Sequence, residues 1–235
     1  MKLTRNRAIA SVLVALVGAS IFATPSQALD RYISVSATGT VKVVPDAVRV
    51  NATVAVVASA NADALSGAGS SATKLREALT ASGIASKDVR STTLSVFPEY
   101  NYTTDKGSTL VGYRASQSFE VIIHNTKNAG TVVDAIVAAV GNTLTVEGVT
   151  PFVSDNTSAT SAARVDAVNR AKAKATSYAK LLGVKLGKIT YLEESSSSSP
   201  YPVMMAMAKS DAGATTIDLG QQDVTISVNT RWGIA

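Results

Sequence analysis

Alanine recurs at every fourth position along one stretch of the chain, at Ala167, Ala171, Ala175 and Ala179. Residues four apart lie one above the other on a helix, so this spacing predicts a long amphipathic helix with a thin apolar face. Because the side chains on that face are small, the backbone of a sheet can approach it closely. Four larger apolar side chains are expected to widen the face: Val165, Val168, Tyr178 and Leu182.

The residues around this helix predict where it begins and ends. The polar run at 154–157 offers N-cap side chains, and Gly183 can take the left-handed conformation that ends a helix. A strand is expected from Val184 to Leu192, so one helix and the strand after it form the predicted core. The charged side chains fall mostly off the alanine face: Arg164, Asp166, Arg170, Lys172, Lys174 and Lys180.

The first 28 residues have the pattern of a secretory signal peptide. Lys2, Arg5 and Arg7 precede an uncharged, mostly apolar run from Ala8 to Phe22, and Ser26-Gln27-Ala28 supplies small residues for cleavage after Ala28. An uncleaved membrane anchor is the alternative, although the run is short for a full span. We therefore expect an exported mature chain, residues 29–235, with no stable transmembrane span, located in the periplasm, the envelope or the cell exterior.

Charge and cysteine content exclude several classes of function. The formal net charge of +5 falls to +2 without the three basic residues of the signal segment, and no basic block is interleaved with aromatic residues. Nucleic-acid binding is therefore disfavoured. The chain has no cysteine, which excludes disulfides, thiol chemistry, cysteine metal sites and a lipid-modified N-terminus.

The mature chain alternates paired strands with helices. Strands are expected at 31–44 and 48–56, paired antiparallel with each other; Gly39 within the first indicates a bulge or a close backbone contact. A helix follows at 61–82, then a hairpin of strands at 87–102 and 109–124, a helix at 127–140, a strand at 144–153, and a last strand at 224–232. Two helices are expected to turn these side chains inward: Ala64, Leu65, Ala68, Ala72, Leu75 and Leu79 in the first, and Val132, Val133, Ile136, Val137 and Val140 in the second.

This order predicts an α+β fold: mostly antiparallel sheet, with three helices packed on one face, as one body or two subdomains. The composition changes after Glu194, where a serine run leads to Pro200 and then to Met204, Met205 and Met207. We interpret residues 195–215 as a flexible surface loop.

Several stretches together resemble the SIMPL-domain family, a bacterial periplasmic immunogenic-protein group also described as a domain of unknown function. They cover nearly the whole mature chain in order: Val35–Val41 with Pro45-Asp46, Gly112–Ser116, Gly148-Val149 with Phe152, Leu181–Lys188, and Val224–Arg231. The chain departs from the family at Ala37, where glycine is frequent, and at Leu219-Gly220, where Pro-Gly is frequent.

The resemblance implies an exported or envelope-associated protein with an α+β fold that forms homo-oligomers, in some members large rings. It also implies loose links to oxidative-stress defence. The family has no accepted catalytic residues, so the resemblance supplies none for this chain.

Residues with possible chemistry each have a simpler structural interpretation. His124, the only histidine, lies between a strand and a helix cap without a nucleophile motif. The three methionines could bind Cu(I), but no histidine or cysteine is near them in sequence. Asp46 and Asp63 lack carboxylate neighbours, Glu193 and Glu194 are expected on opposite sides of a strand, and Gly67-x-Gly69 is only a fragment of a dinucleotide motif. We predict no catalytic, cofactor or metal site.

Three hypotheses follow. The first is a non-enzymatic envelope protein that self-assembles through sheet edges and the long helix, with polar strand faces such as Thr225-Ser227-Asn229-Arg231 on a shared surface. The second is a module that binds a small ligand or metal, with the Ser195–Lys209 loop as a lid. The third, least favoured, is a hydrolase that uses His124.

Overall fold

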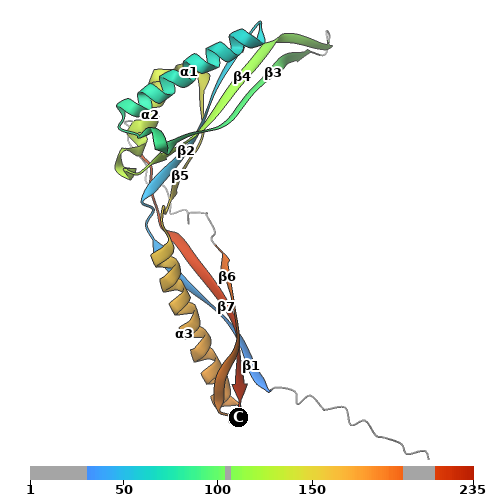
Figure 1. Cartoon of the computed structure of the whole chain (residues 1–235), viewed down its shortest axis with the longest axis vertical. Coiled ribbons are helices and arrows are strands. Elements are labelled where there is room, and N and C mark those ends of the chain that lie inside the picture. Colours follow the sequence, from blue (N-terminus) through green and yellow to red (C-terminus); the bar gives the residue numbers. More distant parts are fainter. Residues whose placement is uncertain (1–30, 104–106, 198–214) are drawn as a thin grey trace, which may run out of the picture. The chain divides into compact units, whose positions relative to one another are not determined.

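The computed structural model describes residues 31–103, 107–197 and 215–235, and the signal segment and the three loop methionines lie outside these ranges. The described residues form seven strands, three α-helices and three short 3-10 turns (Figure 1). None of these helices is long and apolar enough to cross a bilayer. The strands are β1 (Tyr32–Val43), β2 (Ala47–Ala58), β3 (Val89–Thr103), β4 (Gly107–Ile123), β5 (Leu144–Phe152), β6 (Leu186–Ser197) and β7 (Gln222–Ile234). The helices are α1 (Asn61–Ala81), α2 (Ala129–Val140) and α3 (Thr157–Leu181).

The strands form two antiparallel sheets, and each sheet carries its helices on one face. Sheet A has the order β1-β7-β6 and is covered by α3, whereas sheet B has the order β3-β4-β2-β5 and is covered by α1 and α2 (Figure 1). Each sheet has its own hydrophobic cluster. The predicted α+β class and the predicted order of strands and helices are confirmed.

The predicted pairing of the first two strands is wrong. β1 pairs with β7, at the other end of the chain, and β2 pairs with β4 and β5. Pro45 and Asp46 do not reverse the chain between β1 and β2, because the Asp46 N–H donates to the carbonyl of Phe152 and its carboxylate is bound to Ser154. The connection therefore passes from one sheet into the other.

The alanine face of α3 packs on sheet A as predicted. All four predicted alanines are buried, together with Ala159 and Ala163 on the same stripe. Gly39 of β1 allows the closest approach, because a Cβ there would lie 2.1 Å from the carbonyl oxygen of Ala163. The strand pairing continues without a shift through Gly39, so this glycine serves a close contact and not a bulge.

Gly183 ends α3 as expected. Its φ is +67°, and the N–H of Val184 donates to the carbonyl of Ala179, which is the hydrogen bond of a glycine C-cap. At the other end of α3, the polar residues that were predicted to cap the helix have two different roles. Asp155 accepts from the N–H of Thr157, whereas both the N–H and the hydroxyl of Ser154 are bound to Asp46.

Several larger apolar side chains do not face inward as predicted. Five of them are exposed: Leu65, Val137, Val165, Tyr178 and Leu182. The buried stripe of α3 is almost wholly alanine because the helix lies so close to the sheet that bulkier neighbours are excluded. Val168 is half-buried and packs against the alanine cluster. The predicted inward positions Leu75 and Leu79 of α1, and Val132 and Ile136 of α2, are buried.

Residues 215–221 contribute to the core of sheet B before β7 begins. Thr215 donates to the carboxylate of Asp134 through its N–H (3.0 Å) and its hydroxyl (2.6 Å), and these bonds lower the pKa of Asp134. Ile217 and Leu219 pack against the cluster between sheet B and its helices. The end of the predicted 195–215 loop is therefore held on α2.

Replacing Gly39 with alanine should destabilise the protein, because the new methyl group would collide with the backbone of α3. We expect a loss of about 1–3 kcal/mol in the free energy of unfolding, measured by urea denaturation of residues 29–235. Gly69→Ala is the matched control: it lies on α1 with open space at its Cβ and should stabilise by up to about 1 kcal/mol. Equal effects of the two substitutions would contradict the close contact.

Replacing Asp46 with asparagine should weaken the junction between β2 and α3 at neutral pH. The backbone and side-chain hydrogen bonds from Ser154 lower the pKa of Asp46 below its ordinary value of 3.8. The stabilisation is therefore present above pH 3.8 and lost as pH falls through the folded-state pKa. Because Asp46 is exposed, we expect only about 1 kcal/mol at pH 7.

Unfolding of wild type and Asp46→Asn should be compared from pH 7 downwards. The difference in unfolding free energy should shrink in acid, and a constant difference would show that the carboxylate charge is irrelevant. Asp63→Asn is the control, since Asp63 has no hydrogen-bond partner among the described residues and lies in the first turn of α1. Its removal should cost only a few tenths of a kcal/mol, roughly the value of one charge at a helix end.

Candidate functional site

The outer face of sheet A, opposite α3, is polar along its whole length. In β7, Ile226, Val228 and Thr230 turn inward and are buried, so the residues between them face outward. The strand register then places Ser34, Arg231 and Tyr191 in one row across the sheet. The next row holds Ser36, Asn229 and Glu193.

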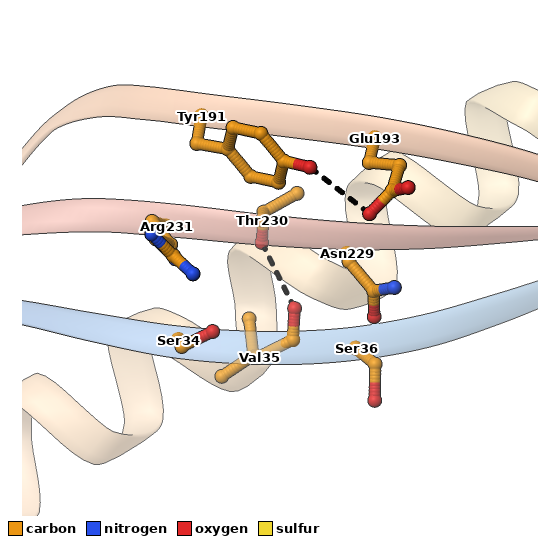
Figure 2. Close-up of a pocket in the computed structure, with 8 residues that line it drawn as sticks. All are labelled: Ser34, Val35, Ser36, Tyr191, Glu193, Asn229, Thr230 and Arg231. Atoms are coloured by element: carbon orange, nitrogen blue, oxygen red, sulfur yellow. Dashed lines mark hydrogen bonds between the residues drawn. The ribbon is translucent and has the colours of Figure 1, made fainter.

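These two rows enclose a groove of about 330 Å³, which we call the sheet A groove (Figure 2). Three adjacent strands contribute its walls, and the helix lies behind them (Figure 2). The lining residues are Ser34, Val35, Ser36, Tyr191, Glu193, Asn229, Thr230 and Arg231.

Arg231 lies between two tyrosine rings. Its Cζ is 5.1 Å from the ring centroid of Tyr32 and 5.2 Å from that of Tyr191, which are cation–π distances. Within residues 31–103, 107–197 and 215–235, no carboxylate forms an ion pair with Arg231. The guanidinium is therefore oriented by aromatic rings while its N–H donors remain available.

Glu193 forms the other charged wall of the groove. The Tyr191 hydroxyl donates to the Glu193 carboxylate at 3.0 Å, and this hydrogen bond raises the pKa of Tyr191. Beneath the groove, the Thr230 hydroxyl donates to the carbonyl of Val35 and accepts from the indole N–H of Trp232. The base of the groove is thus fixed, and its two charged walls are held by tyrosines.

Glu193 and Glu194 point to opposite sides of β6, as predicted. Glu194 accepts two hydrogen bonds from the guanidinium of Arg164 on α3, at 2.6 and 2.8 Å, and this pairing lowers the pKa of Glu194. Glu193 faces the groove. The two adjacent carboxylates therefore cannot act together as an acid–base pair.

His124 lies in a separate hollow of about 380 Å³ at the end of β4. Its Nε2 is 3.3 Å from the carboxylate of Asp88. The hydroxyl of Ser82, which also lines the hollow, donates to the carbonyl of Ala78. This histidine consequently has an acidic partner, but the nearby serine is held away from it.

The other residues that were singled out have structural surroundings. Asp46 lies in the connection between β1 and β2, where it binds Ser154, and Asp63 lies in the first turn of α1. Gly67 faces Val56 of β2, since a Cβ there would lie 2.8 Å from the Val56 Cγ1. Lys172, Lys174 and Lys180 are exposed on α3, and Lys174 donates to the carbonyl of Ser36.

Met204, Met205 and Met207, which were considered as Cu(I) ligands, lie outside the described residues, as does most of the Ser195–Lys209 segment; Ser195–Ser197 belong to β6. Among the described residues, no three histidine, aspartate or glutamate side chains are placed to hold a metal ion. The polar face of β7 was predicted from the sequence, but the roles of Tyr32 and Tyr191 were not. Only the pairing of β7 with both β1 and β6 brings these rings to Arg231.

Comparison with known proteins places the chain in a family. It is 30% identical over 211 residues to the 26 kDa periplasmic immunogenic protein of Brucella melitensis biotype 1, and equally to that of Brucella abortus strain S19. Each alignment covers 84% of this chain and 82% of the relative. The family described as SIMPL, protein of unknown function (DUF541), matches residues 33–232. The chain therefore belongs to the SIMPL family.

Proposed function

We propose that the protein is an exported, non-enzymatic component of the cell envelope that assembles with copies of itself. Export is supported by the signal-peptide pattern of residues 1–28 and by relatives that are named periplasmic. The absence of catalysis is supported by the surroundings of His124, whose nearby serine hydroxyl is bound to a backbone carbonyl. The link to oxidative-stress defence that the family resemblance implies stays a prediction.

The observation that carries the proposal is an exposed apolar patch on sheet B. It covers both faces of the outer part of the β3–β4 hairpin, and we call it the hairpin patch. The alternation of side chains places Val57 and Phe97 on one face, on either side of Arg114, and Tyr100, Tyr102 and Leu110 together on the other face. Phe97 is 66% exposed and Tyr102 is 76% exposed. Exposed apolar surface of this kind marks interaction sites in soluble proteins.

The charged groups that the structure describes beside the hairpin patch compensate each other. Arg114 lies between Val57 and Phe97 and forms two hydrogen bonds with the carboxylate of Glu99, which lower the pKa of Glu99. A charged partner would gain nothing from this surface, whereas an apolar and internally neutralised one would fit it. A second copy of the chain offers such a surface, and a two-fold contact would bury the same patch on both copies.

The face of the hairpin is a better contact than its edge. β3 is an edge strand, but its register shifts at Ser91/Thr93 and at Glu99/Tyr100, and Pro98 lacks an N–H. Bulges and proline on an edge strand discourage pairing with another strand. In place of the expected assembly through sheet edges, we therefore propose a contact through the faces of the hairpin.

A second candidate function is a ligand-binding module, and the sheet A groove is the observation that favours it. Its guanidinium, which pairs with no carboxylate of the part of the chain that the structure describes, and its polar lining are suited to a ligand and not to an apolar protein contact. The two functions use different sheets, so they are compatible with each other.

Assembly can be tested by sedimentation velocity of residues 29–235 at micromolar concentration. We expect an oligomer, and we expect Phe97→Ser/Tyr102→Ser to shift it towards monomer because it removes the most exposed apolar area of the hairpin patch. Val165→Ser is the matched control, since Val165 is 59% exposed on α3, away from the patch. A monomeric wild type would refute self-assembly, and an oligomeric double variant would refute this interface.

A further inference from the structure

We infer that the sheet A groove binds a saccharide that carries a carboxylate, with the carboxylate on Arg231. The geometry of the Arg231 guanidinium favours a carboxylate as its ligand. Arginine presents parallel N–H groups that match the two oxygens of a carboxylate, and a pair of this kind is both strong and directional. Arg231 is held between Tyr32 and Tyr191 without using those donors on any carboxylate of the described residues. This inference does not depend on the proposed assembly.

The remaining walls of the groove are suited to hydroxyl groups. Asn229 offers an amide that both donates and accepts, Ser34 and Ser36 offer hydroxyls, and Glu193 offers an acceptor (Figure 2). A sugar hydroxyl needs a donor and an acceptor at the same time, and this mixture provides both. No purely apolar wall is present that would favour an aliphatic or aromatic ligand.

The spacing of the two rows favours a sugar over smaller anions and zwitterions. Arg231 and Asn229 are two positions apart on β7, so their rows are separated by about 7 Å. A carboxylate on one sugar ring can reach Arg231 while hydroxyls of that ring or the next reach Asn229 and Glu193. An α-amino acid is too short to span both rows. A phosphate dianion would be repelled by the neighbouring carboxylate of Glu193.

The groove is also open along the sheet, which suits a segment of a chain. Small-molecule sites are usually enclosed and mostly apolar, whereas this one is a shallow polar surface continued by further hydroxyls. The Thr38 and Ser227 hydroxyls lie 3.0 Å apart in the next row, and those of Thr40 and Thr225 lie 3.3 Å apart beyond it. A longer acidic saccharide could therefore extend along the face.

The first test is calorimetric titration of residues 29–235 with trigalacturonate and, in parallel, with neutral galactotriose. We expect trigalacturonate to bind at least about tenfold more tightly, equivalent to about 1.4 kcal/mol for the carboxylate–guanidinium pair. Its affinity should fall with added salt, because the site is exposed. Equal affinity for both trisaccharides, or no binding of trigalacturonate, would overturn the inference. So would tighter binding of glycylglycine or inorganic phosphate.

Variants then test whether Arg231 carries the recognition. Arg231→Gln should lower the affinity for trigalacturonate by about tenfold or more, and Arg231→Lys should lower it less, because the charge remains but the planar fork is lost. Lys42→Gln is the matched control: it removes one positive charge from the same face, where Lys42 pairs with Asp223 outside the groove. If Lys42→Gln weakened binding as much as Arg231→Gln, attraction would be unspecific and the inference would fail.

A substitution at Asn229 tests the same groove in case replacement of Arg231 disturbs folding. Asn229→Asp preserves shape but places a negative charge beside the expected position of the carboxylate. It should abolish trigalacturonate binding while the thermal unfolding midpoint stays close to that of the wild type. Unchanged binding by this variant would show that the ligand does not lie in the groove.

Discussion

The close contact between α3 and β1 is the constraint on which sheet A depends. A buried methylene-sized group contributes only about 0.8 kcal/mol, so alanines gain little from area alone. Their contribution depends on how closely the two backbones fit, and Gly39 sets that distance opposite Ala163. Any side chain at Gly39, or a larger one on the stripe, would separate helix and sheet along their whole length.

Sheet B has a core of large side chains, unlike the alanine core of sheet A. The two sheets can therefore have different roles. Its cluster contains large side chains such as Phe119, Leu75 and Ile136, and two helices share the covering. Such a core tolerates an extended hairpin beyond the helices, because the base of the hairpin is firmly packed. Sheet A, which packs on the alanine face of α3, lacks a core of such large side chains. It keeps a sheet of three strands whose outer face is free for polar chemistry.

The local parts of the fold could be predicted from the sequence, but the long-range pairing could not. The four-residue alanine spacing, Gly183 and the alternation in β7 each act within a few residues, and each prediction was confirmed. The pairing of β1 with β7 joins residues almost the whole chain apart, and no local pattern encodes it. For the same reason the sequence suggested the polar face of β7 but could not place Tyr32 and Tyr191 beside Arg231.

The errors in side-chain burial have a related cause. Val165, Tyr178 and Leu182 are apolar and near the alanine stripe, yet a helix seated so closely offers room for only one narrow row. Apolar character alone therefore did not decide burial in α3. Exposed apolar residues on a charged helix are ordinary surface, whereas those on the hairpin patch adjoin one another and have no free charge among them.

The polar groups on the outer faces of sheets A and B differ in their hydrogen-bond and ion-pair partners. This difference distinguishes an ordinary polar surface from a candidate binding site. On sheet B, Thr53 bonds to both Ser118 and Glu147, and Glu120 pairs with both Arg49 and Arg90. Most of those groups pair with one another, which leaves little for a ligand. On sheet A, Arg231 is oriented by rings that cannot neutralise its charge. A preoriented cation that no described carboxylate neutralises gains most from an external anion. The groove is therefore a better candidate for a ligand site than the polar face of sheet B.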